Sequence, residues 1–176
     1  MEMRGRVSSL ELTISLLESL GAKKVETYTF EDRIYFLPGK TSLEEGYTRI
    51  RTPHESNNDS RYRIVQKIKY KGENVEAFKS YSPDLTTAKN SLHGSWLACI
   101  ITRNGVEYQI GNGKIFIENI EEFGFSAEAE FPSKKECKEW LEKLSAKDIN
   151  EYSLPLQFMM HKNKPNVQNP STEGQH

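Results

Sequence analysis

Glutamates recur at alternate positions in the segment FIENIEEFGFSAEAEF, which runs from Phe116 to Phe131. Glu118, Glu128 and Glu130 all occupy even positions among Phe, Ile and Ala, and such alternation is typical of β-strands with one charged face. Carboxylates on one strand face can contact water, or they can hold a divalent metal ion such as Mg²⁺ or Mn²⁺. The choice between these roles depends on where the strands lie in the fold.

Basic residues follow the same alternation elsewhere. In RYRIVQKIKYKG the odd positions are mostly basic and the even positions largely apolar. The basic members are Arg61, Arg63, Lys67, Lys69 and Lys71. Arg49 and Arg51 repeat the pattern in YTRIR, and Glu2, Arg4 and Arg6 repeat it with mixed sign. Most of the predicted strands therefore have one charged face.

Two arrangements explain these charged faces. In the first, a sheet packs its apolar face on a core and exposes its charged face to water. In the second, the sheet closes into a barrel, helices cover its apolar exterior, and the charges converge on a central tunnel. Such a tunnel suits a triphosphate, because Arg and Lys would neutralise its roughly four negative charges while carboxylates hold a metal ion.

Hydrophobic periodicity predicts the helices that must position these strands. The first, within residues 8–24, ends at Gly21 and buries one face, formed by Leu10, Ile14, Leu17 and Leu20. The second lies within residues 82–100 and runs into a strand near Cys99; its apolar residues are Leu85, Leu92, Trp96 and Leu97. The third, within residues 132–148, begins with a capping box from Ser133 to Glu136, and a short helical piece follows within residues 149–160.

The strands are predicted between these helices. They lie within residues 1–7, 25–39, 46–52 and 61–72, near Cys99, and within residues 106–110, 114–120 and 125–131. This order favours an α+β domain built on an antiparallel sheet or barrel.

Length and composition limit the alternatives. The chain has 176 residues, which suits one domain at residues 1–160 and a polar tail at residues 161–176 that we expect to be disordered. Its net charge of -1 gives no reason to expect a nucleic-acid polymer as partner. No apolar run is long enough to cross a membrane, and the start lacks the apolar core of a signal peptide, so we expect a cytoplasmic protein. Cys99 and Cys137 are expected to fill the core.

An ordered set of short motifs resembles the CYTH domain, the triphosphate tunnel fold shared by class IV adenylate cyclases and thiamine triphosphatases. The matching pieces, in order, are SLLESLGAKK, EDRIYFLP, YTRIR, IVQK, IENIEEFGFSAEAE and YSLPL. They cover the chain from Glu2 to about Leu156. The resemblance implies a closed antiparallel β-barrel with a charged interior and flanking helices.

The resemblance also implies roles for individual residues. It implies metal binding by Glu2, Glu118, Glu128 and Glu130. It implies substrate binding by Arg4, Arg49, Arg51, Lys67 and Arg103. Arg63, which precedes the matched lysine on the same strand, is expected to point into the tunnel and to bind substrate as well. The residues expected to act in catalysis are Glu128, Glu130 and Lys67. The sequence departs from the family pattern at its start, where the first glutamate of the E-x-E-x-K strand has no counterpart, and at Gly105, where the pattern has arginine.

Three functions fit these residues. The first is hydrolysis of a triphosphate with Mg²⁺ or Mn²⁺, which we favour because it requires only a metal-activated water. The second is cyclisation of ATP to cyclic AMP and pyrophosphate, which also requires a nucleoside pocket. The third is binding of a triphosphate or nucleotide without turnover. A homodimer remains open, and no membrane partner is expected.

Overall fold

The strands form a single antiparallel sheet, which the helices flank. The computed structural model describes residues 1–53, 60–71 and 73–163. In this part of the chain the strands are β1 (Glu2–Arg6), β2 (Lys23–Phe36), β3 (Gly46–Arg51), β4 (Tyr62–Tyr70), β5 (Glu73–Ser82), β6 (Leu97–Ile110), β7 (Gly113–Ile120), β8 (Gly124–Glu130) and β9 (Lys147–Asn150). The helices are α1 (Leu10–Ser19), α2 (Leu85–Asn90), α3 (Lys134–Lys143) and α4 (Leu154–Lys162). The predicted α+β class is confirmed.

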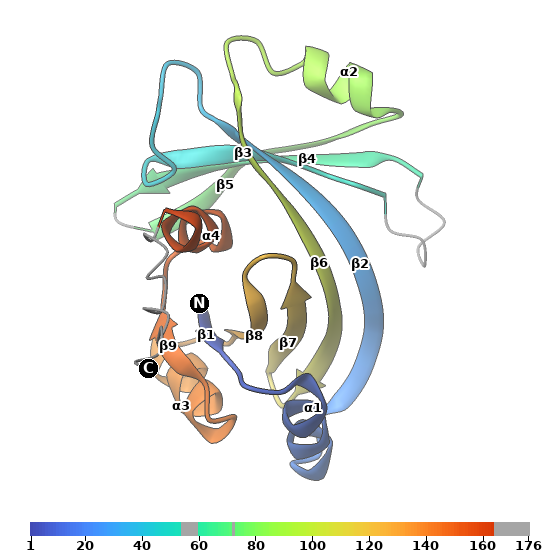
Figure 1. Cartoon of the computed structure of the whole chain (residues 1–176), viewed down its shortest axis with the longest axis vertical. Coiled ribbons are helices and arrows are strands. Elements are labelled where there is room, and N and C mark those ends of the chain that lie inside the picture. Colours follow the sequence, from blue (N-terminus) through green and yellow to red (C-terminus); the bar gives the residue numbers. More distant parts are fainter. Residues whose placement is uncertain (54–59, 72, 164–176) are drawn as a thin grey trace, which may run out of the picture.

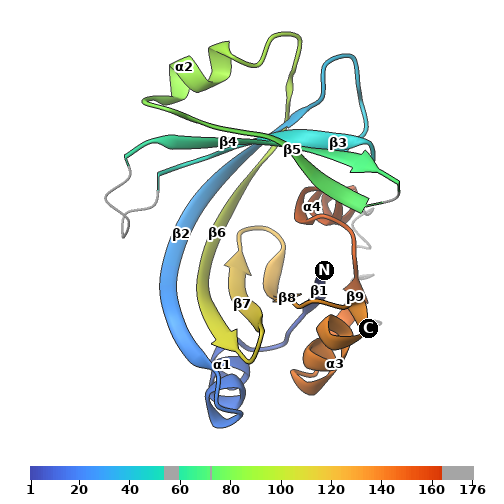
Figure 2. The ribbon, with the colours of Figure 1, turned by 180° about the vertical axis from the view of Figure 1, so that it is seen from behind.

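The sheet curls strongly but its ladder does not close. Its strand order is β5-β4-β3-β2-β6-β7-β8-β1-β9, so β5 and β9 are the two edges, and no ladder joins them within the described residues. The prediction of a closed barrel is therefore not confirmed. Figure 1 shows the long strands β2 and β6 bending around a central space, with α4 on the open side between β9 and the β3–β5 end. The reverse view in Figure 2 shows the same placement of α4.

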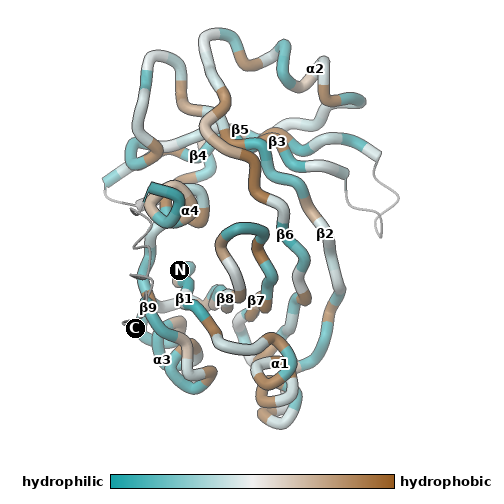
Figure 3. The backbone as a smooth tube through the Cα atoms, viewed as in Figure 1, coloured by the Kyte–Doolittle hydropathy of each residue, from teal (hydrophilic) through white to brown (hydrophobic). Residues whose placement is uncertain are grey.

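Apolar side chains on β6, β7 and β8 pack outward against α1 and α3. Ile115 and Ile117 of β7 belong to this cluster, together with Leu17 of α1 and Leu141 of α3. Phe116, between the two isoleucines, points to the opposite side and lines a cavity. The two-residue period of the strand thus separates a helix-covered apolar face from a polar inner face. Figure 3 shows hydrophilic and hydrophobic residues mixed along the same strands.

A second apolar cluster joins α4 to the curled sheet. Leu154 and Phe158 of α4 pack with Ile34, Ile101 and Tyr47, which come from β2, β6 and β3. α4 begins with Pro155 in its first turn, a position where the missing backbone N–H costs no helical hydrogen bond. A third cluster lies under α2. None of the helices in the described residues is long and apolar enough to span a membrane.

Several predicted elements need correction. The second helix ends at Asn90, so Trp96 and Leu97, expected among its apolar residues, lie outside it and are 53% and 45% exposed. β6 is one continuous strand in place of two short ones, and β5 and β9 were not predicted at all. Both are edge strands, paired on one side only, so their alternation of apolar and polar residues is weak.

Smaller corrections concern the ends of two helices. Leu20, expected on the buried face of the first helix, is 44% exposed. α4 continues through Lys162, so residues 161–162, expected at the start of a disordered tail, are helical. The rest of the predicted tail, residues 164–176, lies outside the described residues. Cys99 and Cys137 are both buried and free of disulfides, as expected for residues that fill the core.

Candidate functional site

The polar face of the curled sheet surrounds a cavity of about 510 Å³. Among the described residues its lining includes seven basic and seven acidic side chains, so the two signs balance. The basic ones are Arg4, Arg49, Arg51, Arg61, Arg63, Lys67 and Arg103, and the acidic ones are Glu2, Glu26, Asp32, Glu76, Glu107, Glu128 and Glu130. The charged faces of the strands therefore converge on one space.

Nearly all of the site residues expected from the sequence line this cavity. The substrate-binding set Arg4, Arg49, Arg51, Arg63, Lys67 and Arg103 does so, as do Glu2, Glu128 and Glu130. Glu118 is the exception, because its side chain is fully buried behind Arg4 and Arg103. The structure thus brings these residues together, while their roles stay predictions.

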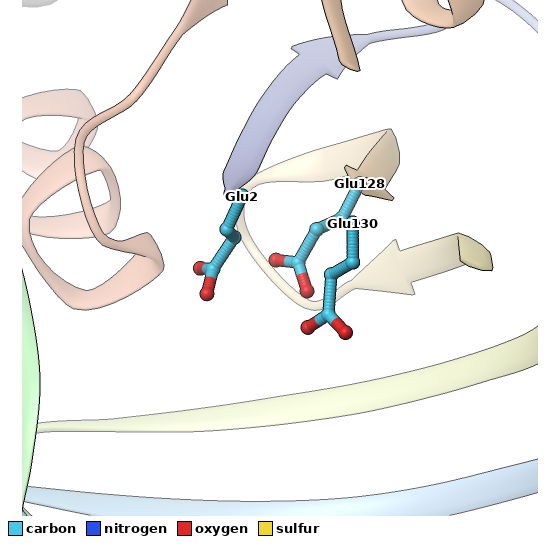
Figure 4. Close-up of side chains that lie close together, drawn as sticks. All are labelled: Glu2, Glu128 and Glu130. Atoms are coloured by element: carbon cyan, nitrogen blue, oxygen red, sulfur yellow. The ribbon is translucent and has the colours of Figure 1, made fainter. Parts of the chain in front are cut away.

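Three glutamates form an acidic trio at one part of the lining. Glu2 comes from β1 and faces Glu130 of β8 across the ladder, and Glu128 lies two residues before Glu130 on the same strand face. One carboxylate oxygen of each lies within 4.8 Å of the others. Figure 4 shows the three side chains extending from the two strands toward a common point. This is a geometry in which carboxylates can share one divalent cation.

The surroundings of the acidic trio disfavour negative charge. Burial raises the pKa of Glu128 to about 7, and repulsion from Glu2 and Glu118 adds to the effect, although Arg4 opposes it. The pKa of Glu130 is also raised, mainly by burial and then by Glu2. A bound divalent cation would relieve this repulsion, and hard oxygen ligands are the kind that Mg²⁺ and Mn²⁺ prefer. The donor set therefore fits the expected metal ion.

Glu118 lies in a different environment. One of its oxygens accepts hydrogen bonds from Arg103 Nε at 2.8 Å and from the Tyr28 hydroxyl at 2.7 Å, and the other accepts from Arg4. Burial alone would raise the pKa of Glu118, but Arg103 and Arg4 lower it to about 2. Both oxygens are thus occupied by donors. This geometry favours a role in positioning Arg4 and Arg103 over the metal binding implied by the resemblance.

Asp32 of β2 is a central site residue that the sequence analysis missed. It is only 2% exposed and accepts two hydrogen bonds from Arg51, from Nε at 2.6 Å and from Nη2 at 2.7 Å. Arg103 Nη1 donates to Asp32 Oδ2 at 3.2 Å, the same oxygen that accepts from Arg51 Nη2. Although burial opposes ionisation, Arg51 and Arg49 hold the pKa of Asp32 well below its usual range. A signal was present in the sequence, because Asp32 is on the same strand face as Glu26 and Tyr28.

Arg49 of β3 is a buried arginine of the cavity wall whose charge is compensated, in the described part of the chain, only by a long ion pair. Its Nε is buried without a hydrogen-bond partner among the described residues, and the Oδ1 atom of Asp32 is 3.9 Å away. Burial and then repulsion from Arg51 lower the pKa of Arg49 to about 10. A buried cation with unused donors is costly to the protein unless an anion supplies the missing contacts. The Arg49 side chain is therefore able to bind an anionic ligand.

Lys67 of β4 connects the basic wall to the acidic trio. Its Nζ atom is 3.8 Å from Glu2 Oε2, although β4 and β1 lie far apart in the strand order. The contact is possible only because the sheet curls back on itself. A second cavity of about 670 Å³ also includes Glu2, Lys67 and Glu130 in its lining. Two members of the acidic trio, Glu2 and Glu130, thus border both cavities.

Tyr28 occupies the space above Gly105, where the family pattern has arginine. A Cβ atom on residue 105 would lie 2.5 Å from the Tyr28 ring, so only glycine permits this close approach. The ring stacks on Phe30 with centroids 4.8 Å apart and meets Phe116 edge-on at 6.4 Å. Where the family pattern has a cation, this chain therefore has the aromatic ring of Tyr28, whose hydroxyl donates a hydrogen bond to Glu118.

Comparison with known proteins identifies the fold. No protein-family model and no curated protein sequence matches the chain. Among solved structures it is similar to the PH1012 protein of Pyrococcus horikoshii, with a TM-score of 0.69 and 20% identity, covering 90% of this chain and 99% of that protein. A candidate adenylate cyclase of Vibrio parahaemolyticus gives a TM-score of 0.68 at 12% identity, with 91% and 97% covered.

A third similar structure carries a description of activity. It is a candidate adenylyl cyclase of Hippeastrum, described as having a dominant triphosphatase activity, with a TM-score of 0.63 at 14% identity and 94% and 98% of the two chains covered. At these identities the likeness concerns the fold alone. The chain has the fold of CYTH-type triphosphate tunnel proteins, and the resemblance seen in the sequence is confirmed at that level.

Proposed function

We propose that the protein hydrolyses a triphosphate with the help of Mg²⁺ or Mn²⁺. The observation that carries the proposal is the combination within one cavity of a trio of carboxylates within 4.8 Å and the buried, poorly compensated Arg49. Carboxylates and arginines on the same strand face could each be ordinary surface features. Their convergence around one cavity of about 510 Å³ supports a ligand that needs both.

The metal ion would be held by Glu2, Glu128 and Glu130. When bound, it would neutralise phosphate charge and lower the pKa of a water molecule near the terminal phosphorus. The described lining residues, seven basic and seven acidic, support this requirement, because among them there is no excess positive charge to offset a triphosphate. Lys67, beside Glu2, would contact the phosphate end nearest the trio.

The arginines would bind and orient the phosphate chain. Arg49 offers donors that no described residue uses, and Arg63 lines the same wall with its Glu76 partner 3.7 Å away. Asp32 fixes the orientation of Arg51 through two parallel hydrogen bonds, so that the remaining donors of its guanidinium are held in place. Pre-positioned donors of this kind lower the barrier to phosphoryl transfer without later rearrangement.

An enclosed tunnel is also part of this proposal. The Lys67–Glu2 contact joins strands that are distant in the sheet order, and α4 contributes Leu154 and Pro155 to the cavity wall. A triphosphate bridging Arg49 and the acidic trio would link the same two sides of the curl. A cytoplasmic location and a triphosphate or nucleotide ligand remain predictions.

ATP cyclisation is the second candidate, and one observation favours it. The aromatic residues Phe30, Tyr81 and Phe116 line the cavity and could contact a nucleobase. Hydrolysis remains the stronger proposal because the Phe30 ring already has two neighbours. The Arg51 guanidinium carbon lies 4.2 Å from the Phe30 ring centroid, and Tyr28 stacks on the same ring. The products, phosphate or cyclic AMP, distinguish the two reactions.

The test is turnover of inorganic triphosphate and of nucleoside triphosphates with Mg²⁺ or Mn²⁺, with phosphate and cyclic AMP both measured. Glu130→Gln should lower turnover by at least about a hundredfold while triphosphate binding persists, since even outer partners of metal ligands contribute about 10- to 100-fold. Glu139→Gln, on the exposed surface of α3, is the matched control. Tight binding without turnover by the unaltered protein would replace hydrolysis by simple binding. Full turnover in EDTA would exclude the metal requirement.

A further inference from the structure

Helix α1 carries leucines on two of its faces. On the inner face, Leu17 is fully buried, with Leu10 and Ile14 packed against the same core cluster. On the outer face, Leu12, Leu16 and Leu20 follow one another at intervals of four residues and are 72%, 37% and 44% exposed. Residues four apart lie one above the other on a helix, so these three form a continuous outer leucine row.

A second apolar face is unusual on a surface helix. Such a helix normally has one apolar stripe toward the core and polar residues elsewhere. The outer leucine row is separate from the cavity, since none of its members lines that space. Figures 1 and 3 show α1 at one end of the molecule, far from α2 and α4, with hydrophobic residues along it. The row therefore has no role in the proposed catalytic site.

We propose that the outer leucine row is the contact through which two copies of this chain associate weakly about a two-fold axis. In an antiparallel pair of α1 helices, Leu16 lies against Leu16 of the second copy, and Leu12 lies against Leu20. Ser15 and Ser19 are exposed beside the row, and their small side chains allow the two helices to approach closely. The face is thus self-complementary in shape along its length.

The charges at the two ends of α1 support a second copy as the occupant. Glu11 is exposed in the first turn, and Lys23 and Lys24 are exposed just beyond the end of the helix. The antiparallel arrangement brings Glu11 of each copy level with the basic pair of the other. A two-fold axis repeats this attraction, so opposite charges flank the leucines at both ends.

Other parts of the chain do not offer a better occupant. Residues 164–176 have the sequence KPNVQNPSTEGQH, in which Val167 is the sole aliphatic residue larger than proline. The contact is small, because a helix of ten residues is about 15 Å long and a standard stable interface buries about 1,600 Å². Association should therefore be reversible, with a dissociation constant in the micromolar range or weaker.

Sedimentation equilibrium of the full chain over a wide concentration range tests the proposal. The average mass should rise with concentration from 20.3 kDa toward twice that value. Leu16→Glu should weaken the association at least about a hundredfold, because the two-fold axis places the change twice in one interface. Leu97→Glu is the matched control, since Leu97 is 45% exposed at the other end of β6 and should leave association unchanged. Circular dichroism and triphosphate binding confirm that each variant is folded.

Charge reversal distinguishes this specific interface from non-specific hydrophobic association. Glu11→Lys alone should weaken association severalfold at low salt, and Lys23→Glu with Lys24→Glu should do the same. Combining all three changes should restore it, because the attraction across the axis is rebuilt with opposite signs. A chain that stays monomeric at every concentration overturns the proposal, whether the face then binds another protein or vesicles of anionic lipid. A dimer insensitive to Leu16→Glu also overturns it.

Discussion

Glu118 and the acidic trio of Glu2, Glu128 and Glu130 lie in the same part of the sheet, yet their surroundings are opposite. Glu118 is saturated by Arg4, Arg103 and Tyr28, and its pKa falls to about 2 although burial opposes this. In the trio, burial together with repulsion from Glu2 and Glu118 raises the pKa of Glu128 to about 7, although Arg4 opposes this. Glu118 and Glu128 come from strands with the same alternation of charged and apolar residues, so the sequence pattern alone cannot distinguish their environments.

The difference shows how one residue type serves two purposes within a few ångströms. A carboxylate whose oxygens are all used by fixed donors holds those donors in place and has little capacity for a metal ion. Carboxylates that face one another gain from a shared cation, even though one oxygen of Glu128 already accepts a hydrogen bond from Arg4. We therefore propose that Glu118 belongs to the structural frame of the cavity, and ligand binding by the acidic trio stays a prediction.

The largest expected effect tests this division directly. Glu118→Gln removes the charge that compensates two buried arginines, and should lower the free energy of unfolding by about 3–5 kcal/mol in urea denaturation. Glu130→Gln should change it by less than about 1 kcal/mol, because a like-charged neighbour is also removed. Equal losses in the two variants would contradict the assignment.

A second comparison concerns Arg49 and Arg51 in the basic wall. Arg49→Ala should weaken triphosphate binding by about 1.5–3 kcal/mol, or ten- to a hundredfold, with little loss of stability, because its donors have no strong internal partner. Arg51→Ala should lower stability as well, since it leaves Asp32 without its bidentate partner. Isothermal titration calorimetry and urea denaturation measure the two quantities. Arg33→Ala is the control, because Arg33 does not line the cavity.

Gly105→Ala should destabilise the protein by about 1–3 kcal/mol, the usual cost of overpacking a tight site. The new Cβ would force Tyr28 away from its place and so disturb the hydrogen bond to Glu118. Thermal unfolding measures the loss. The cost should shrink in the background of Tyr28→Ala, where the ring is absent. An equal cost in both backgrounds would show that the close approach of the ring is unimportant.

The smallest expected effect is in the pH dependence of stability. The lowered pKa of Glu118 contributes stability that is present above its unfolded value and is lost as pH falls toward about 2. Glu128 acts in the opposite sense, because its raised pKa gives stability at acid pH that is lost as pH rises through about 7. Glu128→Gln should therefore remove roughly 1–2 kcal/mol of the stability decrease between about pH 5 and pH 8. An unchanged profile in urea denaturation without divalent ions would contradict this.

Much of the site could be predicted from strand alternation. The period of two residues places Arg49 with Arg51 and Glu128 with Glu130 on common faces, whatever the fold around them. The ordered motifs then indicated that these faces meet around one space, and the cavity contains both pairs. The strong signals were long strands with one consistently charged face.

Other features depended on contacts between distant strands. Asp32 is a single acidic residue in β2, and its importance comes from Arg51 on β3 and Arg103 on β6. The edge strands β5 and β9 were missed because they pair on one side only. The exposure of Leu12 and Leu16 was equally invisible, since an apolar helical residue gives no sign of whether another element covers it.

The sequence by itself determined the strand periods, the helix caps at Ser9 and Ser133, and the residue types that line one face, because these depend on local backbone geometry and short-range hydrogen bonds. Only the tertiary structure decided that the curled sheet remains open at β5 and β9, that Lys67 reaches Glu2, and that Glu118 accepts hydrogen bonds at both oxygens while Glu2, Glu128 and Glu130 face one another. The physical reason is that burial and charge compensation arise between side chains that the curl of the sheet brings together. The spacing of these residues along the chain does not indicate the distances between their side chains.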